Sequence, residues 1–178
     1  MTKSEIRKAI RLRVGGMSAE TRAAKSAAIC RQVAATEEWQ QANIVAFFSP
    51  LASEPNIDLL WAVLKTQTIC YPRVDGDQLV FIQVPDRSAL LESQWNLREP
   101  AHREDRVVPP RAIKLILVPG LAFTIDGHRL GRGGGYYDRL LSGAIQRSST
   151  FGICFAEQLL PRIPMEDHDQ AVGRVFAA

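Results

Sequence analysis

The chain has 178 residues, of which 46% are hydrophobic, 23% charged and 7% aromatic. These proportions are typical of globular domains and exclude a chain that is disordered throughout. The formal net charge of +3 says little by itself, but a basic amino-terminal segment on a mildly acidic body does not indicate nucleic-acid binding over the whole surface. A chain of this size buries roughly 70% of the surface that its unfolded form exposes, so folding needs neither disulfides nor a structural metal. We expect a single domain over residues 1–178.

The sequence predicts neither a membrane span nor a secretory signal. Apolar runs such as residues 44–48 are far shorter than the about 20 residues that a helix needs to cross a bilayer. The first dozen residues carry four basic side chains and no apolar run. Cys30, Cys70 and Cys154 are widely spaced, which predicts reduced thiols in a protein of the cytoplasm. The histidines form no H-E-x-x-H pattern, so zinc hydrolysis is not expected.

Two helices are expected before the first strand. Apolar side chains at positions 6, 10 and 14 predict an amphipathic helix over residues 3–14, which Gly15 and Gly16 end. Ser18 is a typical helix cap and predicts a second helix to about residue 36. The first 31 residues carry eight basic and two acidic side chains. This local excess of positive charge indicates an anionic ligand bound near the amino terminus.

Five short runs of branched and aromatic residues predict buried strands. Residues 57–64 have helical spacing, so the strand, helix, strand order predicts a parallel pair with a right-handed crossover. Asp75-Gly76-Asp77 is a turn signal that predicts a hairpin. We therefore expect an α/β three-layer sandwich, in which a mostly parallel, mixed sheet is covered by helices on both faces. The predicted strands are residues 44–48, 68–71, 79–84, 115–118 and 151–155.

Residues 129–138 read Arg-Leu-Gly-Arg-Gly-Gly-Gly-Tyr-Tyr-Asp and contain the densest cluster of glycines. Such a loop lets backbone amides approach a ligand, and Arg132 and the start of a helix predicted at residue 136 add positive charge. We interpret the segment as a phosphate cradle. It is neither a Walker loop nor a dinucleotide fingerprint, because no Gly-Lys-Ser/Thr follows and no strand runs directly into it. The alternatives are a flexible hairpin and an Arg-Gly-Gly contact to RNA.

The first predicted helix carries a basic stripe. Lys3, Arg7 and Arg11 recur every four residues, and like charges at this spacing repel one another. An anion facing the stripe would offset this repulsion, so the pattern favours an anionic ligand beside the helix. The alternative is a solvated basic surface.

Two acidic positions are candidate magnesium ligands. Asp138 is one, because magnesium at a nucleotide is held by one or two carboxylates together with phosphate oxygens. Its alternative role is that of an acid stabilised by the start of a helix. Asp169 is a candidate for the second ligand, and spacing alone does not select it over Glu166 or Asp167.

Loops after the predicted strands supply further candidates, because ligands of α/β sheets bind outside the carboxyl ends of the strands. Ser49 and Glu54 follow the first strand, and Glu54 is suited to a ligand with several N–H groups. The alternative for Glu54 is a helix-start residue before a proline. Arg73 and Trp95 are other candidates, whose alternative roles are in turns and packing.

Together these segments resemble the 5-formyltetrahydrofolate cyclo-ligase family, also called methenyltetrahydrofolate synthetases, over nearly the whole chain. The most specific motif is the glycine segment with its Tyr-Tyr-Asp ending. The chain departs from the usual family residues at Thr124, Ile57 and Gly173. The motifs that carry the resemblance are Lys3 and Arg7, Glu54, Tyr71-Pro-Arg73, Glu99-Pro100, residues 118–123, residues 127–138 and His168-Asp169.

The resemblance implies a ligase that uses ATP and Mg²⁺ to close 5-formyltetrahydrofolate to 5,10-methenyltetrahydrofolate, with release of ADP and phosphate. A phosphorylated formyl (imidate) intermediate is implied, and Lys3 and Arg132 are the implied catalytic residues. The implied magnesium ligands are Asp138 and Asp169. The implied folate-binding residues are Ser49, Glu54, Arg132 and Tyr136. The implied ATP-binding residues are Lys3, Arg7, Arg129, Leu130, Gly131, Arg132, Gly133, Gly134, Gly135, Tyr136 and Tyr137.

Two other functions remain as alternatives. A module that contacts RNA is disfavoured, because Arg-Gly-Gly occurs once and the basic helix lacks interleaved aromatic residues. A family member could also keep the nucleotide site and act on a different substrate, since a fold and a phosphate site do not define the second substrate. The resemblance implies small-molecule partners, namely reduced folate and ATP, without nucleic acid or membrane, and a monomer.

Overall fold

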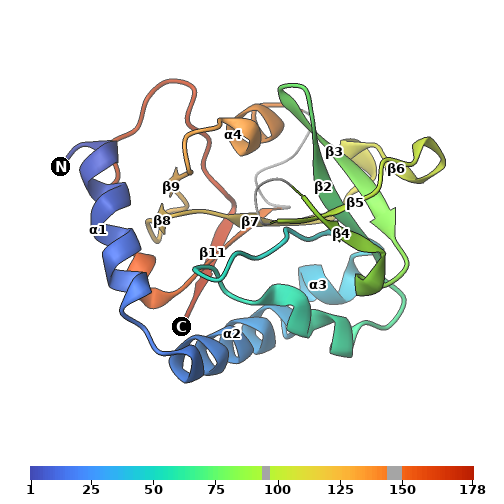
Figure 1. Cartoon of the computed structure of the whole chain (residues 1–178), viewed down its shortest axis with the longest axis horizontal. Helices are drawn as coiled ribbons and strands as arrows, with labels where there is room; N and C mark the ends of the chain where they lie inside the picture. Colours follow the sequence, from blue (N-terminus) through green and yellow to red (C-terminus); the bar gives the residue numbers. More distant parts are fainter. Residues whose placement is uncertain (94–96, 144–149) are drawn as a thin grey trace.

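A computed structural model describes residues 1–93, 97–143 and 150–178 of the chain (Figure 1). Its centre is a seven-stranded sheet in which four neighbouring pairs are parallel and two are antiparallel. The mixed, mostly parallel sheet expected from the sequence is therefore confirmed. In spatial order its strands are β11 (Arg174–Ala177), β10 (Thr150–Cys154), β7 (Leu115–Pro119), β1 (Ile44–Ala46), β2 (Thr68–Asp75), β3 (Gln78–Val84) and β6 (Val107–Val108).

Helices lie on both faces of this sheet, as expected for a three-layer sandwich (Figure 1). In the view of Figure 1, α2 (Ala19–Ala34), α3 (Glu37–Gln41) and the 3-10 helix η1 (Ile57–Val63) lie below the sheet. The short helix α4 (Tyr136–Leu141) lies above it, and α1 (Lys3–Gly15) runs along one side. No helix of the described residues is long and apolar enough to cross a membrane.

Several shorter elements complete the fold. Two pairs of short strands form separate hairpins, and one of them leads into the glycine segment. The hairpins are β4 (Leu90–Glu92) with β5 (Arg98–Pro100), and β8 (Ala122–Phe123) with β9 (Arg129–Leu130). Within the described residues the other 3-10 helices are η2 (Arg87–Ala89), η3 (Glu104–Arg106), η4 (Pro110–Ala112) and η6 (Ala156–Gln158).

Capping residues set the bounds of the first helices. Thr2 and Glu5 form a reciprocal capping box at the start of α1, and Ser18 caps α2. The expected second helix was too long, because Thr36 accepts a hydrogen bond from the Trp39 amide and begins α3 as a separate helix. The apolar stripe of α1 is buried as predicted.

The segment after β1 differs from the expected α-helix. Residues 57–63 form a 3-10 helix, in which side chains three positions apart share a face. Ile57 and Leu60 are the two fully buried side chains of that face. The parallel pairing of β1 with β2 is confirmed, and so is the hairpin of β2 with β3, where Gly76 adopts a φ of 60°.

The sheet separates two layers of core, because successive side chains of a strand point to opposite faces. Leu115 and Leu117 of β7 pack towards α1, α2 and η1, whereas Ile116 and Val118 pack in the second layer, which α4 borders. The three cysteines are buried free thiols, as expected. Burial raises the pKa of Cys30 to about 11.

Candidate functional site

The glycine loop, residues 131–135, connects β9 to α4. Gly133 and Gly135 have φ values of 113° and 68°, which side-chain-bearing residues rarely adopt. Gly135 also occupies the cap position of α4, where no side chain caps the helix. The first amides of α4 are therefore available to a ligand at the loop.

The basic stripe of α1 faces this loop in part. The Arg7 Nε donates a hydrogen bond to the Gly131 carbonyl at 3.0 Å, across 124 positions of sequence. Lys3 and Arg7 are both partly buried, whereas Arg11 is exposed. Two of the three basic side chains therefore border the site, and the third lies in the solvent.

Lys3 joins α1 to the segment before β11. Its Nζ lies 2.5 Å from Asp169 Oδ2 and 3.2 Å from Glu166 Oε1. Burial opposes the charge on Lys3, but the hydrogen bonds and charges of the two carboxylates outweigh it and raise the pKa of Lys3. Burial likewise opposes the charge on Asp169, and the hydrogen bonds from Lys3 and the Glu166 amide lower its pKa. Asp169 and Glu166 thus lie at the same cation, and Asp169 is the more buried of the two.

Arg132 of the glycine loop reaches the segment that follows β1. Its Nη2 and Nε lie 2.7 and 3.1 Å from Glu54 Oε1. The other carboxylate oxygen of Glu54 accepts a hydrogen bond from the Leu51 amide at 3.0 Å. The side chain of Glu54 is 5% exposed and that of Arg132 38% exposed. The structure therefore brings together the residue expected at the phosphates and the residue expected at the folate.

Ser49 lies earlier in the same segment, nearer to β1. Its Oγ accepts a hydrogen bond from the Arg98 amide at 2.9 Å and ties the end of β1 to β5. Arg73 donates to the Pro100 carbonyl at 3.0 Å, on the same hairpin. Trp95 lies outside the described residues.

Arg129 and Leu130 of β9 are buried, so their side chains are not presented to solvent. The Nη2 of Arg129 lies 2.7 Å from Asp138 Oδ1, and the Gln170 amide donates to the same oxygen at 3.3 Å. Arg129 also lies over the Tyr137 ring, 5.7 Å from its centroid. Burial raises the pKa of Tyr137 above its usual range. Asp138 is thus the counter-ion of a buried arginine.

The two expected magnesium ligands border one segment, because Asp138 contacts the backbone of residue 170 and Asp169 lies next to it in the chain. In residues 1–93, 97–143 and 150–178, no three His, Cys, Asp or Glu side chains form a group that could hold a metal alone. Two carboxylates suit a magnesium ion that takes most of its oxygen ligands from a nucleotide and water. Asp138 and Asp169 are of the residue type that such an ion takes as protein ligands.

Arg139 of α4 is a residue that sequence reasoning missed. Its Nε donates to the Asp77 carbonyl at 2.7 Å and its Nη2 to the Gly134 carbonyl at 3.0 Å. The guanidinium also lies 4.9 Å from the centroid of the Tyr136 ring. The three-residue spacing from Tyr136 is a signal for this last contact, because side chains at that spacing are neighbours on a helix.

Comparison with known proteins gives a consistent result. The sequence model of a family described as "5-formyltetrahydrofolate cyclo-ligase family" matches residues 1–178. A mouse protein named 5-formyltetrahydrofolate cyclo-ligase is 30% identical over 98% of this chain and 92% of its own length. The resemblance seen in the sequence motifs and the expected enzyme class, a ligase, are thereby confirmed.

Two solved structures share the fold. The 5,10-methenyltetrahydrofolate synthetase of Aquifex aeolicus has a TM-score of 0.86 and 30% identity, and the match covers 99% of this chain and 90% of that one. A 5,10-methenyltetrahydrofolate synthetase from Mycoplasma pneumoniae has a TM-score of 0.79 at 23% identity, over 99% of this chain and 98% of that one. At that identity the second likeness concerns the fold alone.

Proposed function

The chain belongs to the 5-formyltetrahydrofolate cyclo-ligase family, and from this premise we propose that it uses ATP to close 5-formyltetrahydrofolate to 5,10-methenyltetrahydrofolate. One observation is the main support for this proposal. Arg132 of the glycine loop and Glu54 after β1 lie in contact, at 2.7 Å. A phosphate held by the loop and a folate held by Glu54 would therefore meet at the same place.

The reaction needs activation of a poor electrophile. The formyl oxygen attacks the γ-phosphorus of ATP, the bond to ADP breaks, and a phosphorylated imidate forms. N10 of the folate then attacks the formyl carbon, the carbon–oxygen bond breaks, and phosphate leaves while N10 loses its proton to solvent or phosphate. Little covalent chemistry falls to the protein, so catalysis rests on positioning and on neutralising phosphoryl charge.

Side chains from two segments, α1 and the glycine loop, would supply that neutralisation. Lys3 and Arg7 of α1 would hold ATP phosphates beside the loop, and Arg132 would hold the transferred group. The backbone of residues 131–137 would cradle the phosphates, with Tyr136 and Tyr137 at the start of α4. Arg129 and Leu130 are buried, so their part would be to support this backbone rather than to touch the nucleotide with their side chains.

The folate would lie on the other side of Arg132. Glu54 would accept hydrogen bonds from pterin N–H groups, and Ser49 and Tyr136 would border the same substrate. The buried carboxylate of Glu54 favours such donors, because a buried charge needs partners. Binding of folate would replace Arg132 as a partner of Glu54.

Asp138 and Asp169 would hold the magnesium ion that accompanies the nucleotide. Bound magnesium neutralises charge on phosphate oxygens and orients them. Asp138 Oδ1 is engaged by Arg129, which leaves its second oxygen for this role. Asp169 would have to share its carboxylate between the ion and Lys3.

The same proposal includes the wider setting of the enzyme. We propose a single domain that acts as a monomer in the cytoplasm on small molecules, without nucleic acid or membrane. The buried free thiols support a reducing compartment.

The test is to incubate the purified protein with 5-formyltetrahydrofolate and MgATP and to follow the near-ultraviolet absorbance of methenyltetrahydrofolate. Product is expected only in the complete mixture, and reactions without ATP or without Mg²⁺ are the controls. Absence of product from a protein that still binds ATP would overturn the proposed substrate and would favour a family member with a different second substrate.

A further inference from the structure

Arg139 joins two parts of the structure that are distant in the sequence, the glycine loop and the turn between β2 and β3. Its guanidinium donates to the carbonyl of Gly134 in the glycine loop and to the carbonyl of Asp77 at the turn between β2 and β3. The turn lies 62 positions away in the chain and belongs to the central sheet. The glycine loop is thereby attached to the sheet through one side chain.

A loop of this composition needs such an attachment. Glycines lose more conformational freedom on folding than any other residue, so the loop has little intrinsic order. Arg7 holds one end of it, at the Gly131 carbonyl, and Arg139 holds the other, at the Gly134 carbonyl. Arginine suits a contact to two carbonyls because its planar guanidinium presents several N–H groups in a fixed arrangement.

The contact to Gly134 also sets the direction of a neighbouring donor. In a trans peptide the carbonyl of one residue and the amide of the next point in opposite directions, and the chain has no cis peptide bond among the described residues. Holding the Gly134 carbonyl towards Arg139 therefore turns the Gly135 N–H away from Arg139. Among the backbone hydrogen bonds that the described residues form outside helices and strands, none is donated by this N–H.

The neighbours of Arg139 are shaped to admit its guanidinium. A Cβ built on Gly135 would lie 2.6 Å from Arg139 Nη1, so a side chain at that position would displace the guanidinium. On its other side the guanidinium lies against the ring of Tyr136. Glycine at position 135 thus has two reasons: it adopts the φ of 68°, and it leaves room for the Arg139 guanidinium.

We propose that Arg139 is a positioning residue that orients the Gly134–Gly135 peptide so that the Gly135 amide is presented to a nucleotide phosphate. The inference rests on the proposed function, because it assumes a nucleotide at the glycine loop. Arg139 acts through the backbone of the glycine loop. It differs in this from Lys3 and Arg132, whose charges would contact the phosphates.

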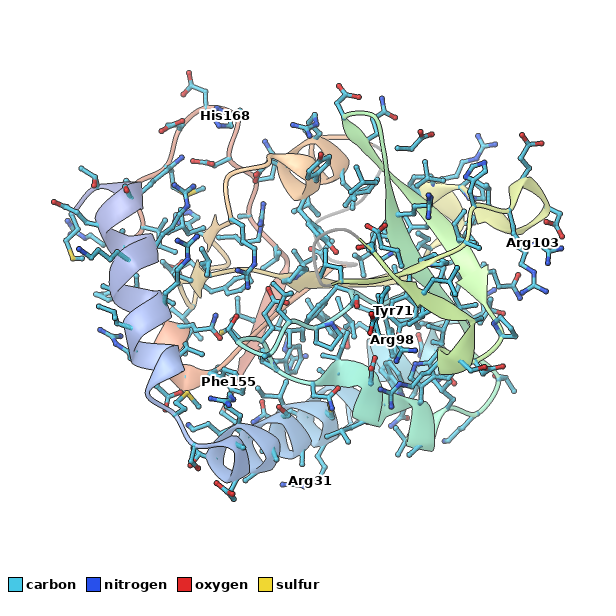
Figure 2. The ribbon with its side chains drawn as sticks, in the orientation of Figure 1. Arg31, Tyr71, Arg98, Arg103, Phe155 and His168 are labelled. Carbon is cyan, nitrogen blue, oxygen red and sulfur yellow. The ribbon has the colours of Figure 1, made fainter. Side chains whose placement is uncertain are left out.

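The test compares three variants with the wild-type protein. Arg139→Lys keeps the charge but lacks the fork that reaches two carbonyls, and Arg139→Met removes both. Arg103→Met is the matched control, since Arg103 is an exposed arginine paired with Asp105 at the opposite end of the molecule from α1 (Figure 2). The measurements are calorimetric titration with MgADP, the KM values for ATP and folate, and the amide proton shift of Gly135 on adding MgADP.

We expect both Arg139 variants to bind MgADP about tenfold more weakly and to raise the KM for ATP by a similar factor, because a misplaced donor loses its geometry. The KM for folate and the melting temperature should stay near those of the wild type. The downfield shift of the Gly135 amide proton on adding MgADP should appear in the wild type and in Arg103→Met, and be lost in both Arg139 variants.

Two results would overturn the inference. One is an Arg139→Lys variant with wild-type MgADP affinity and a wild-type Gly135 shift, since charge alone would then suffice. The other is an Arg139 variant in which the KM values for ATP and for folate rise equally and the melting temperature falls. That result would indicate a merely structural role. A wild-type protein that binds MgADP but forms no methenyl product would overturn the proposed reaction and leave this inference standing. A wild type that binds no MgADP would overturn both.

Discussion

Arg132 and Glu54 lie 78 positions apart in the chain, and the guanidinium of Arg132 donates two hydrogen bonds to a single carboxylate oxygen of Glu54. The contact joins the glycine loop to the segment after β1. Under the proposed function, one partner would bind phosphate and the other would bind folate. In the structure each neutralises the other, so a ligand that takes one of them changes the electrostatic surroundings of the second.

A first prediction follows for the nucleotide. We expect Glu54→Gln to bind MgADP about threefold to fivefold more tightly than the wild type, because Arg132 no longer has a carboxylate partner and a partly exposed ion pair is worth up to about 1 kcal/mol. Calorimetric titration with MgADP measures the effect. Ser53→Ala is the control, since it removes only the longer contact of Arg132, at 3.3 Å. Equal or weaker MgADP binding by Glu54→Gln would show that the pair does not compete with phosphate.

A second prediction concerns the cations themselves. Lys3→Met and Arg132→Met should each lower kcat about 100-fold or more. Preorganised cations of a protein that face a reacting phosphoryl group stabilise its charge by effects of that size. The rate is measured as methenyltetrahydrofolate formation at saturating MgATP. Arg11→Met is the matched control, because Arg11 lies on the same helix stripe but is exposed. Rates within twofold of the wild type for Lys3→Met or Arg132→Met would contradict their proposed catalytic roles.

Much of the fold was predictable because its central strands are continuous apolar runs. The five predicted strands all appear, and β2 and β3 extend further into the hairpin than predicted. Strands such as β8 and β9 are only two residues long, so they carry no periodicity to detect. They are recognisable only from their pairing with each other, which forms the hairpin between β7 and the glycine loop.

The candidate site was predictable as a set of residues but not as a set of contacts. The motifs indicated six charged residues, and the structure brings them together in three pairs, Lys3 with Asp169, Arg132 with Glu54, and Arg129 with Asp138. Partners that lie 78 or 166 positions apart depend on the tertiary fold, which no local spacing encodes. Contacts to backbone carbonyls are harder still to foresee, since any residue supplies the acceptor.

A third prediction concerns packing of the central sheet. Gly152 of β10 lies beneath Phe123, and a Cβ there would be 2.6 Å from the Phe123 ring and 3.0 Å from Val172. We expect Gly152→Ala to lower the free energy of unfolding by about 1 to 3 kcal/mol through overpacking. Urea unfolding measures the change.

Gly15→Ala is the control for that change. Nothing lies within 4 Å of a Cβ built on Gly15, which is the last residue of α1. The free energy of unfolding should stay unchanged or rise by up to about 1 kcal/mol, because alanine is the better helix former. A Gly152→Ala variant as stable as Gly15→Ala would contradict the conclusion that Phe123 leaves no room for a side chain at position 152.

A fourth prediction concerns pH. The pKa of Asp169 is lowered from its ordinary 3.8, so its contribution to stability is present above pH 3.8 and is lost as the pH falls through the lower folded value. The pKa of Lys3 is raised above 10.5, so its contribution is present below pH 10.5 and is lost as the pH rises through the higher folded value. The stabilisation from this pair should therefore be constant from about pH 5 to 9.

Denaturant unfolding of the wild type and Asp169→Asn at several pH values tests this expectation. The wild type should be more stable than Asp169→Asn at pH 7. The difference should vanish once the pH is below the folded pKa of Asp169. A difference that persists unchanged there would mean that the carboxylate charge does not stabilise the fold.

The last prediction separates two roles of Asp138. Arg129 is 3% exposed at its side chain and has Asp138 as its carboxylate partner at 2.7 Å. Removing one partner of a buried pair leaves an uncompensated charge, so Asp138→Asn should lower the free energy of unfolding by about 3 kcal/mol without any ligand. Asp105→Asn, which breaks an exposed pair with Arg103, should leave stability unchanged. Urea unfolding measures both variants.

The metal role of Asp138 needs a separate measurement, because a loss of activity in Asp138→Asn would follow from either role. We expect the folded variant to bind ADP with wild-type affinity in the presence of a chelator, and to gain less affinity than the wild type when Mg²⁺ is added. A variant that gains as much from Mg²⁺ as the wild type, yet is destabilised, would establish Asp138 as the counter-ion of Arg129 alone. The magnesium would then depend on Asp169 and the nucleotide.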